Sequence, residues 1–131
     1  MGPGGRVAAS RLIGLTLGLL TAQPALAGQV DVLEVDIRPG TAPGRYDLAV
    51  TLRHADSGWD HYANRWEVIG PDGAVLATRV LFHPHVHEQP FTRSLSGVRI
   101  PAEFTWITVR GHDLVHGHGG REVTLSVPQH P

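Results

Sequence analysis

Short segments in which apolar and polar side chains alternate recur along this chain of 131 residues. Such alternation is typical of β-strands with one buried face, because successive side chains point to opposite faces of a sheet. Turn-forming residues separate the segments, and no segment has a convincing helical period. We therefore predict an all-β fold. The expected strands are Val30–Ile37, Tyr46–Leu52, Arg65–Ile69, Ala74–Phe82, Thr92–Ile100, Thr105–Arg110 and Glu122–Val127.

The number and spacing of these strands indicate one antiparallel sandwich. Trp66 lies in the third strand, Gly70-Pro71-Asp72-Gly73 forms the turn after it, and Ile107–Arg110 leads into a glycine-rich loop. In these features the chain resembles a seven-stranded immunoglobulin-like (Ig-like) or fibronectin type III-like sandwich, without the cysteine pair of antibody domains. It also resembles uncharacterised small bacterial exported proteins with a similar His-Gly-x-Gly-Gly segment, here His116–Gly120. We expect Trp66 in the core.

The first 27 residues have the pattern of a secretory signal peptide. Arg6 and Arg11 are positively charged, Leu12–Leu20 is a short apolar run, and Pro24–Ala27 has the small-x-small pattern of a signal peptidase site. The run is too short for a comfortable membrane span, although an uncleaved anchor is the alternative. We predict that residues 1–27 are removed and that residues 28–131 form the domain, in the periplasm or outside the cell, without a membrane span.

Composition excludes two possibilities. The chain has 11 arginines and no lysine against 12 acidic residues, and nucleic-acid binding needs a basic face, so no nucleic-acid partner is expected. It has no cysteine, so a lipid cannot be attached in the manner of bacterial lipoproteins, and the exported domain must be stabilised by packing alone.

The histidines are concentrated in three places. Eight of the nine lie in three segments: His54 and His61; His83, His85 and His87; and His112, His116 and His118. In the predicted sandwich these segments lie in or beside loops at one end of the domain. The segments expected at the opposite end, residues 39–44, 71–73 and 101–103, contain no histidine. We predict that the three groups meet in one imidazole-rich site.

The middle group suggests its own geometry. If the strand continues past Phe82, residues two apart share a face, so His83, His85 and His87 point one way. Val80, Phe82, Pro84 and Val86 then form the apolar face. The alternative is that these histidines are only the polar face of an amphipathic edge strand, where a proline is tolerated.

We predict that a metal ion binds where the loops meet. His85, His87 and His118 are expected at its centre, and Asp113 is expected to be a ligand or to orient a histidine. Structural hydrogen bonding is an equally good role for His112. Asp60 is also a plausible ligand, and the further candidates are His61, His83, His112 and His116.

The available ligands restrict the metal. After Met1 the chain contains neither cysteine nor methionine, which excludes Cu(I) sites with soft ligands and blue-copper sites. Imidazole with carboxylate suits Zn(II), Cu(II) or Ni(II), and Zn(II) or Cu(II) is the expected cofactor.

Two functions follow from these patterns. The first is an exported, histidine-rich protein that binds Zn(II) or Cu(II) for metal handling or sensing. The second is a non-metal Ig-like interaction or adaptor module of the cell envelope, with an envelope protein as its partner. Catalysis has less support, since the chain lacks a Gly-x-Ser-x-Gly elbow, a phosphate-binding glycine loop and a His-Glu-x-x-His helix.

Overall fold

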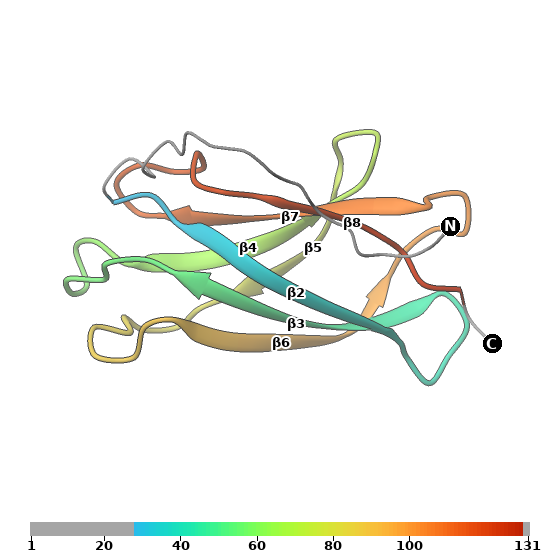
Figure 1. Ribbon diagram of the computed structural model, residues 1–131, viewed down its shortest axis with the longest axis horizontal. Coiled ribbons are helices and arrows are strands. Elements are labelled where there is room, and N and C mark those ends of the chain that lie inside the picture. The colour runs from blue at the N-terminus through green and yellow to red at the C-terminus, as the bar shows by residue number, and fades with distance from the viewer. Residues whose placement is uncertain (1–27, 130–131) are drawn as a thin grey trace, which may run out of the picture.

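The computed structural model describes residues 28–129 as two packed antiparallel sheets (Figure 1). Residues 1–27, and with them the predicted signal peptide, lie outside the described residues. The strands within the described part are β2 (Asp31–Pro39), β3 (Arg45–Arg53), β4 (Ala63–Ile69), β5 (Val75–Val80), β6 (Phe91–Arg99), β7 (Trp106–Asp113) and β8 (Val123–Ser126). The prediction of an all-β sandwich with seven antiparallel strands is therefore confirmed.

The two sheets enclose one apolar core. One sheet has the order β2-β3-β6 and the other the order β5-β4-β7-β8. Inward-facing residues of both sheets are buried, as the alternating pattern predicts, with Leu48 at 1% and Val109 at 0% exposure. Trp66 is fully buried at the centre of β4, which confirms its predicted place in the core.

Strand register places four strand ends beside one another. Within the first sheet, Asp31 at the start of β2 pairs with Arg53 at the end of β3. Within the second sheet, Ala63 at the start of β4 pairs with Asp113 at the end of β7. The three histidine-containing loops leave the sandwich at this same end, at the left of Figure 1. The prediction that the three histidine groups lie at one end is thus confirmed.

Two strand boundaries differ from the predicted ones. β5 ends at Val80, before the middle histidine group, and β7 continues to Asp113, so His112 is a strand residue. The shared strand face predicted for His83, His85 and His87 is therefore wrong. Beyond β5 the chain turns inward and buries His85, whereas Phe82 remains 73% exposed; the expected apolar face points outward.

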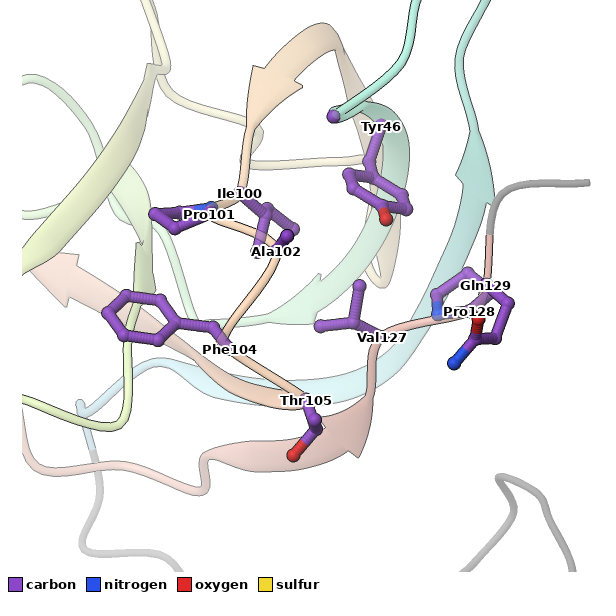
Figure 2. A pocket seen from close by; sticks show the side chains of 10 residues that line it. Tyr46, Ile100, Pro101, Ala102, Phe104, Thr105, Val127, Pro128 and Gln129 are labelled. Carbon is purple, nitrogen blue, oxygen red and sulfur yellow. The ribbon is translucent and has the colours of Figure 1, made fainter.

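The opposite end of the domain contains a pocket of about 260 Å³. It lies between the β6–β7 connection and the segment that follows β8 (Figure 2). Figure 2 shows the rings of Tyr46 and Phe104 and the side chain of Val127 around it. No histidine or acidic residue lines this pocket, so it offers no ligands of the kind gathered at the other end.

Candidate metal centre

Asp56 connects the loops at the histidine-rich end. The chain leaves β3 at Arg53, and Asp56 is buried three residues later. One carboxylate oxygen accepts a hydrogen bond from the backbone N–H of Ala63 at 3.0 Å, and the other accepts one from the N–H of His85 at 2.7 Å. A single buried carboxylate thereby joins the β3–β4 loop to the loop after β5.

Asp113 forms the floor of the site. It is the last residue of β7 and is 0% exposed. Its Oδ1 accepts hydrogen bonds from the backbone N–H groups of Val115 at 2.8 Å and His116 at 2.6 Å, which hold the tight turn after the strand. Its Oδ2 is buried without a hydrogen-bond partner. A buried carboxylate oxygen without a partner carries a desolvation cost, so this atom is suited to accept a cation or a proton.

Three imidazole rings converge on Asp113. His54 Nε2 lies 3.5 Å from Oδ2, His61 Nε2 lies 3.4 Å from Oδ1, and His116 Nδ1 lies 3.3 Å from Oδ1. The carbonyl oxygen of Gly28 also enters the group, 2.8 Å from His54 Nε2 and 3.2 Å from His61 Nε2. We call these five residues the β7-end cluster.

The spacing within this cluster matches that of metal ligands. Two ligand atoms that each lie about 2.0–2.1 Å from one ion at a tetrahedral angle are about 3.3–3.4 Å apart. His61 Nε2 and His116 Nδ1 lie at such distances from Asp113 Oδ1, and His54 Nε2 lies 3.5 Å from the other oxygen, Oδ2. One ligand atom from each of His54, His61 and Asp113 lies within 4.8 Å of the others. These three residues could therefore hold a metal ion.

Asp56 also fixes the orientation of the His54 ring. His54 Nδ1 lies 2.5 Å from Asp56 Oδ1, so the carboxylate accepts a hydrogen bond from this nitrogen and leaves Nε2 facing Asp113. A carboxylate that orients a ligating histidine through its second nitrogen is a common feature of protein metal sites. Asp56 is therefore a positioning residue of the β7-end cluster.

Electrostatics require positive charge at this place. Burial favours the neutral form of Asp113 and so raises its pKa, but the N–H groups of His116 and Val115 outweigh burial and lower the pKa overall. Burial likewise raises the pKa of Asp56, and its hydrogen bond from His54 reverses the shift. Two ionised carboxylates buried close together are costly without a compensating cation.

His54 supplies that charge in the absence of metal. Burial lowers its pKa, but the hydrogen bonds to Asp56 and to the Gly28 carbonyl, together with the charges of Asp56 and Asp113, outweigh burial and raise the pKa above 6.5. Both ring nitrogens thus face hydrogen-bond acceptors. A metal ion at Nε2 would take the place of one proton and carry more charge.

The cluster is accessible from one side. The side chains of His54 and Asp113 are 0% exposed, whereas those of His61 and His116 are 23% and 35% exposed. An ion bound here would have buried ligands behind it and a side open to water, the arrangement of sites that keep a free coordination position.

Glycines beside the cluster make room for the N-terminal segment 28–30. A Cβ on Gly111 would lie 2.3 Å from Val30 Cγ1, and one on Gly120 would lie 1.8 Å from the Val30 carbonyl oxygen. A Cβ on Gly119 would lie 2.4 Å from the Gln29 side chain. Glycine permits tight turns, and in the structure Gly119 and Gly120 also let segment 28–30 pass close to the backbone, which brings Gly28 to the histidines.

A second network contains two of the predicted ligands. Glu67 accepts hydrogen bonds from Arg65 and Arg110, each at 2.9 Å, and from His118 Nε2 at 3.1 Å. His112 Nδ1 lies 2.7 Å from the side-chain oxygen of Asn64, and the His112 and His118 rings meet edge to face at 4.9 Å. Burial, and then the charges of Arg65 and His118, lower the pKa of His112.

The middle histidines lie outside the β7-end cluster, and His85 approaches its positioning residue Asp56, with Nδ1 3.9 Å from Oδ2. His85 is buried and stacks on Phe91 with ring centroids 4.0 Å apart, and neither of its ring nitrogens has a hydrogen-bond partner. Burial, followed by the charges of Arg93 and His83, lowers its pKa. The His83 ring lies 4.6 Å from that of His85, while His87 and Asp60 are exposed.

The structure thus brings together His61, Asp113 and His116 from the predicted ligand set. It places His118 at Glu67, His112 at Asn64 beside the His118 ring, and His83, His85 and His87 in the loop after β5. His54, Asp56 and Gly28 belong to the site but were absent from the predicted set. The sequence did carry a signal for two of these residues. His54 and Asp56 directly follow a strand, and a short loop at that point can turn both side chains inward.

One comparison with known proteins detects a relative. The chain is 41% identical over 92 residues to a protein of Halomicrobium mukohataei whose name is "Putative lipoprotein". The match covers 70% of this chain and 45% of the relative, so the chain spans about half the length of the protein that it matches. No protein-family model and no solved structure matches the chain. Within residues 28–129 no helix is long and apolar enough to span a membrane.

Proposed function

We propose that this domain is an exported metal-binding protein whose site is the β7-end cluster, with His54, His61 and Asp113 as ligands and His116 as a fourth. The observation that carries the proposal is the convergence of three imidazole nitrogens on one buried carboxylate at 3.3–3.5 Å. The unpartnered Oδ2 of Asp113 and the orienting carboxylate of Asp56 support it.

Zn(II) or Cu(II) is the metal that this ligand set suits. Imidazole nitrogen combined with carboxylate oxygen suits both ions, whereas Mg(II) and Ca(II) prefer oxygen alone. The exposed side at His61 and His116 favours handover or sensing of the ion over a closed structural site. The proposal of export rests on the signal-like residues 1–27, and the name of the relative is consistent with it.

The direct test is metal titration of untagged protein. Zn(II) and Cu(II) are titrated against a chromophoric chelator at neutral pH, first with the wild type and then with His61→Ala and His54→Ala. Loss of an outer-sphere partner alone lowers metal affinity by about 10–100-fold, so removal of a ligand should cost at least as much. His61 is partly exposed, so His61→Ala tests ligation with less risk to the fold.

His87→Ala is the matched control. His87 is an exposed histidine in a neighbouring loop, and its removal should leave affinity unchanged. The ligand set predicted from sequence, centred on His85, His87 and His118, makes the opposite prediction. Loss of binding in His87→Ala with normal binding in His61→Ala would overturn the β7-end cluster in favour of that set.

The second candidate is an Ig-like interaction module of the envelope. Large apolar side chains are exposed around the histidine-rich end, with Trp59 at 65%, Phe82 at 73% and Val115 at 60%. Exposed apolar side chains gathered at one end are typical of protein interaction sites. Wild-type affinity for metal no better than that of a histidine-rich peptide would favour this candidate.

A further inference from the structure

We propose that the α-amino group of Gly28, freed when residues 1–27 are removed, is itself a ligand of the metal ion. The inference rests on the metal-binding function proposed above and adds its regulation. Metal affinity would reach its full value only after export and cleavage.

The position of Gly28 is the first observation. Its carbonyl oxygen lies between two ligand histidines, 2.8 Å from His54 Nε2 and 3.2 Å from His61 Nε2. The amino nitrogen and the carbonyl oxygen of one residue can close a five-membered chelate ring on one ion. Because the carbonyl oxygen of Gly28 already lies among the ligand atoms, only a free amine is needed to complete this chelate ring.

The need for glycine at this position is the second observation. A Cβ on Gly28 would lie 2.4 Å from His116 Cε1, and the residue has a φ of +95°. Both the contact and the backbone conformation disfavour a side chain. The first residue of the predicted mature chain therefore packs closely against the His116 ring.

The anchoring of segment 28–30 is the third observation. Val30 is 1% exposed and Val32 is 0% exposed, and the N–H of Val32 donates to the Arg121 carbonyl at 2.8 Å. Gly111 and Gly120 leave the space that Val30 fills. The fold thus holds Gly28 in place from the β2 side.

Cleavage changes the chemistry of one atom. Before cleavage, the nitrogen of Gly28 is a peptide nitrogen, whose lone pair is delocalised into the carbonyl group and which binds metal poorly. After cleavage it is an amine with an unperturbed pKa of about 7.7–8.0, able to lose a proton and coordinate Zn(II) or Cu(II). The precursor would then compete weakly for metal inside the cell.

The chain offers a clean chemical test. It contains no lysine, so the α-amino group of the mature protein is its one primary amine and can be acetylated selectively. Three samples are compared by Cu(II) and Zn(II) competition titration: protein beginning at Gly28, the same protein after acetylation, and protein that begins one residue earlier at Ala27. All three contain every strand of the described sandwich.

The expected result is tightest binding by unmodified protein beginning at Gly28. Acetylation, or the extra residue, should weaken binding by at least about tenfold, since even outer-sphere partners contribute that much. Acetylation of the Ala27 form should change nothing further. With glycine labelled by ¹⁵N, the copper electron paramagnetic resonance spectrum should change only in the first sample.

Three results would overturn the inference. Equal, tight binding by all three samples, still lost in His61→Ala, would remove the amine as a ligand and leave the proposed function intact. If none of the three samples binds metal more tightly than His61→Ala does, the proposed function and this inference are overturned together. A mature N-terminus other than Gly28, found by sequencing the exported protein, would also end the inference.

Discussion

Replacement of Gly120 by alanine should destabilise the fold through one backbone contact. The added Cβ would lie 1.8 Å from the carbonyl oxygen of Val30, whereas real Cβ contacts do not fall below 3.0 Å. Segment 28–30 must therefore move by about 1 Å or more. Gly120 does not have a positive φ, so backbone strain contributes nothing and the whole effect comes from the contact.

The size of the destabilisation can be worked out from the contacts that this movement disturbs. Overpacking a tight site costs about 1–3 kcal/mol. The shift also strains two hydrogen bonds of 2.8 Å, from Val32 N–H to the Arg121 carbonyl and from Arg121 N–H to Asp31 Oδ1, each contributing about 0.5–1.5 kcal/mol. The free energy of unfolding should fall by about 2–6 kcal/mol, and the melting temperature by at least about 8 °C for a domain of this size.

Urea denaturation and thermal melting of Gly120→Ala measure the effect. Gly73→Ala is the control, because Gly73 has a φ of +86° and nothing within 4 Å of its added Cβ. It should lose only about 1–2 kcal/mol from backbone strain and retain full metal affinity, whereas Gly120→Ala should also bind metal less tightly. An unfolding free energy of Gly120→Ala within about 0.5 kcal/mol of wild type would refute the close approach of segment 28–30.

Three further outcomes are expected. Trp66→Ala should lower the free energy of unfolding by about 3–5 kcal/mol, and a urea midpoint close to wild type would contradict its burial. Asp56→Asn should lower zinc affinity by about 10–100-fold without removing a ligand, while Asp60→Asn, at an exposed site, should not. In metal-free protein the raised pKa of His54 stabilises the fold below pH 6.5, and this contribution is lost as pH rises through the folded-state pKa. The lowered pKa values of Asp56 and Asp113 stabilise the fold above about pH 4 and are lost as pH falls. The lowered pKa values of His85 and His112 act in the opposite direction on the alkaline side, but they are common to wild type and His54→Ala. The stability difference between wild type and His54→Ala, measured in chelator, should therefore shrink as pH rises above 6.5, and a difference that does not change with pH would contradict the assignment for His54.

Local patterns determined the architecture. The period of two and the turn residues are properties of a few neighbouring residues, so the strands and the burial of Trp66 could be predicted without knowledge of the fold. The number of strands then restricted the topology enough to place all three histidine groups at one end. Strand ends were less predictable: the sequence does not show that β5 stops at Val80 or that β7 carries His112 and Asp113.

The choice of ligands depended on the tertiary structure. Eight histidines near one another allow many triads, and the direction of each ring depends on contacts distant in sequence. Asp56 reaches across to the N–H of His85, Glu67 engages His118, and Gly28 lies beside His54 only because Gly111 and Gly120 leave room for Val30. The sequence by itself determined which end of the sandwich is rich in imidazole. The tertiary structure decided which imidazoles share a buried carboxylate, because burial and ring orientation are set by packing between segments that the chain order does not bring together.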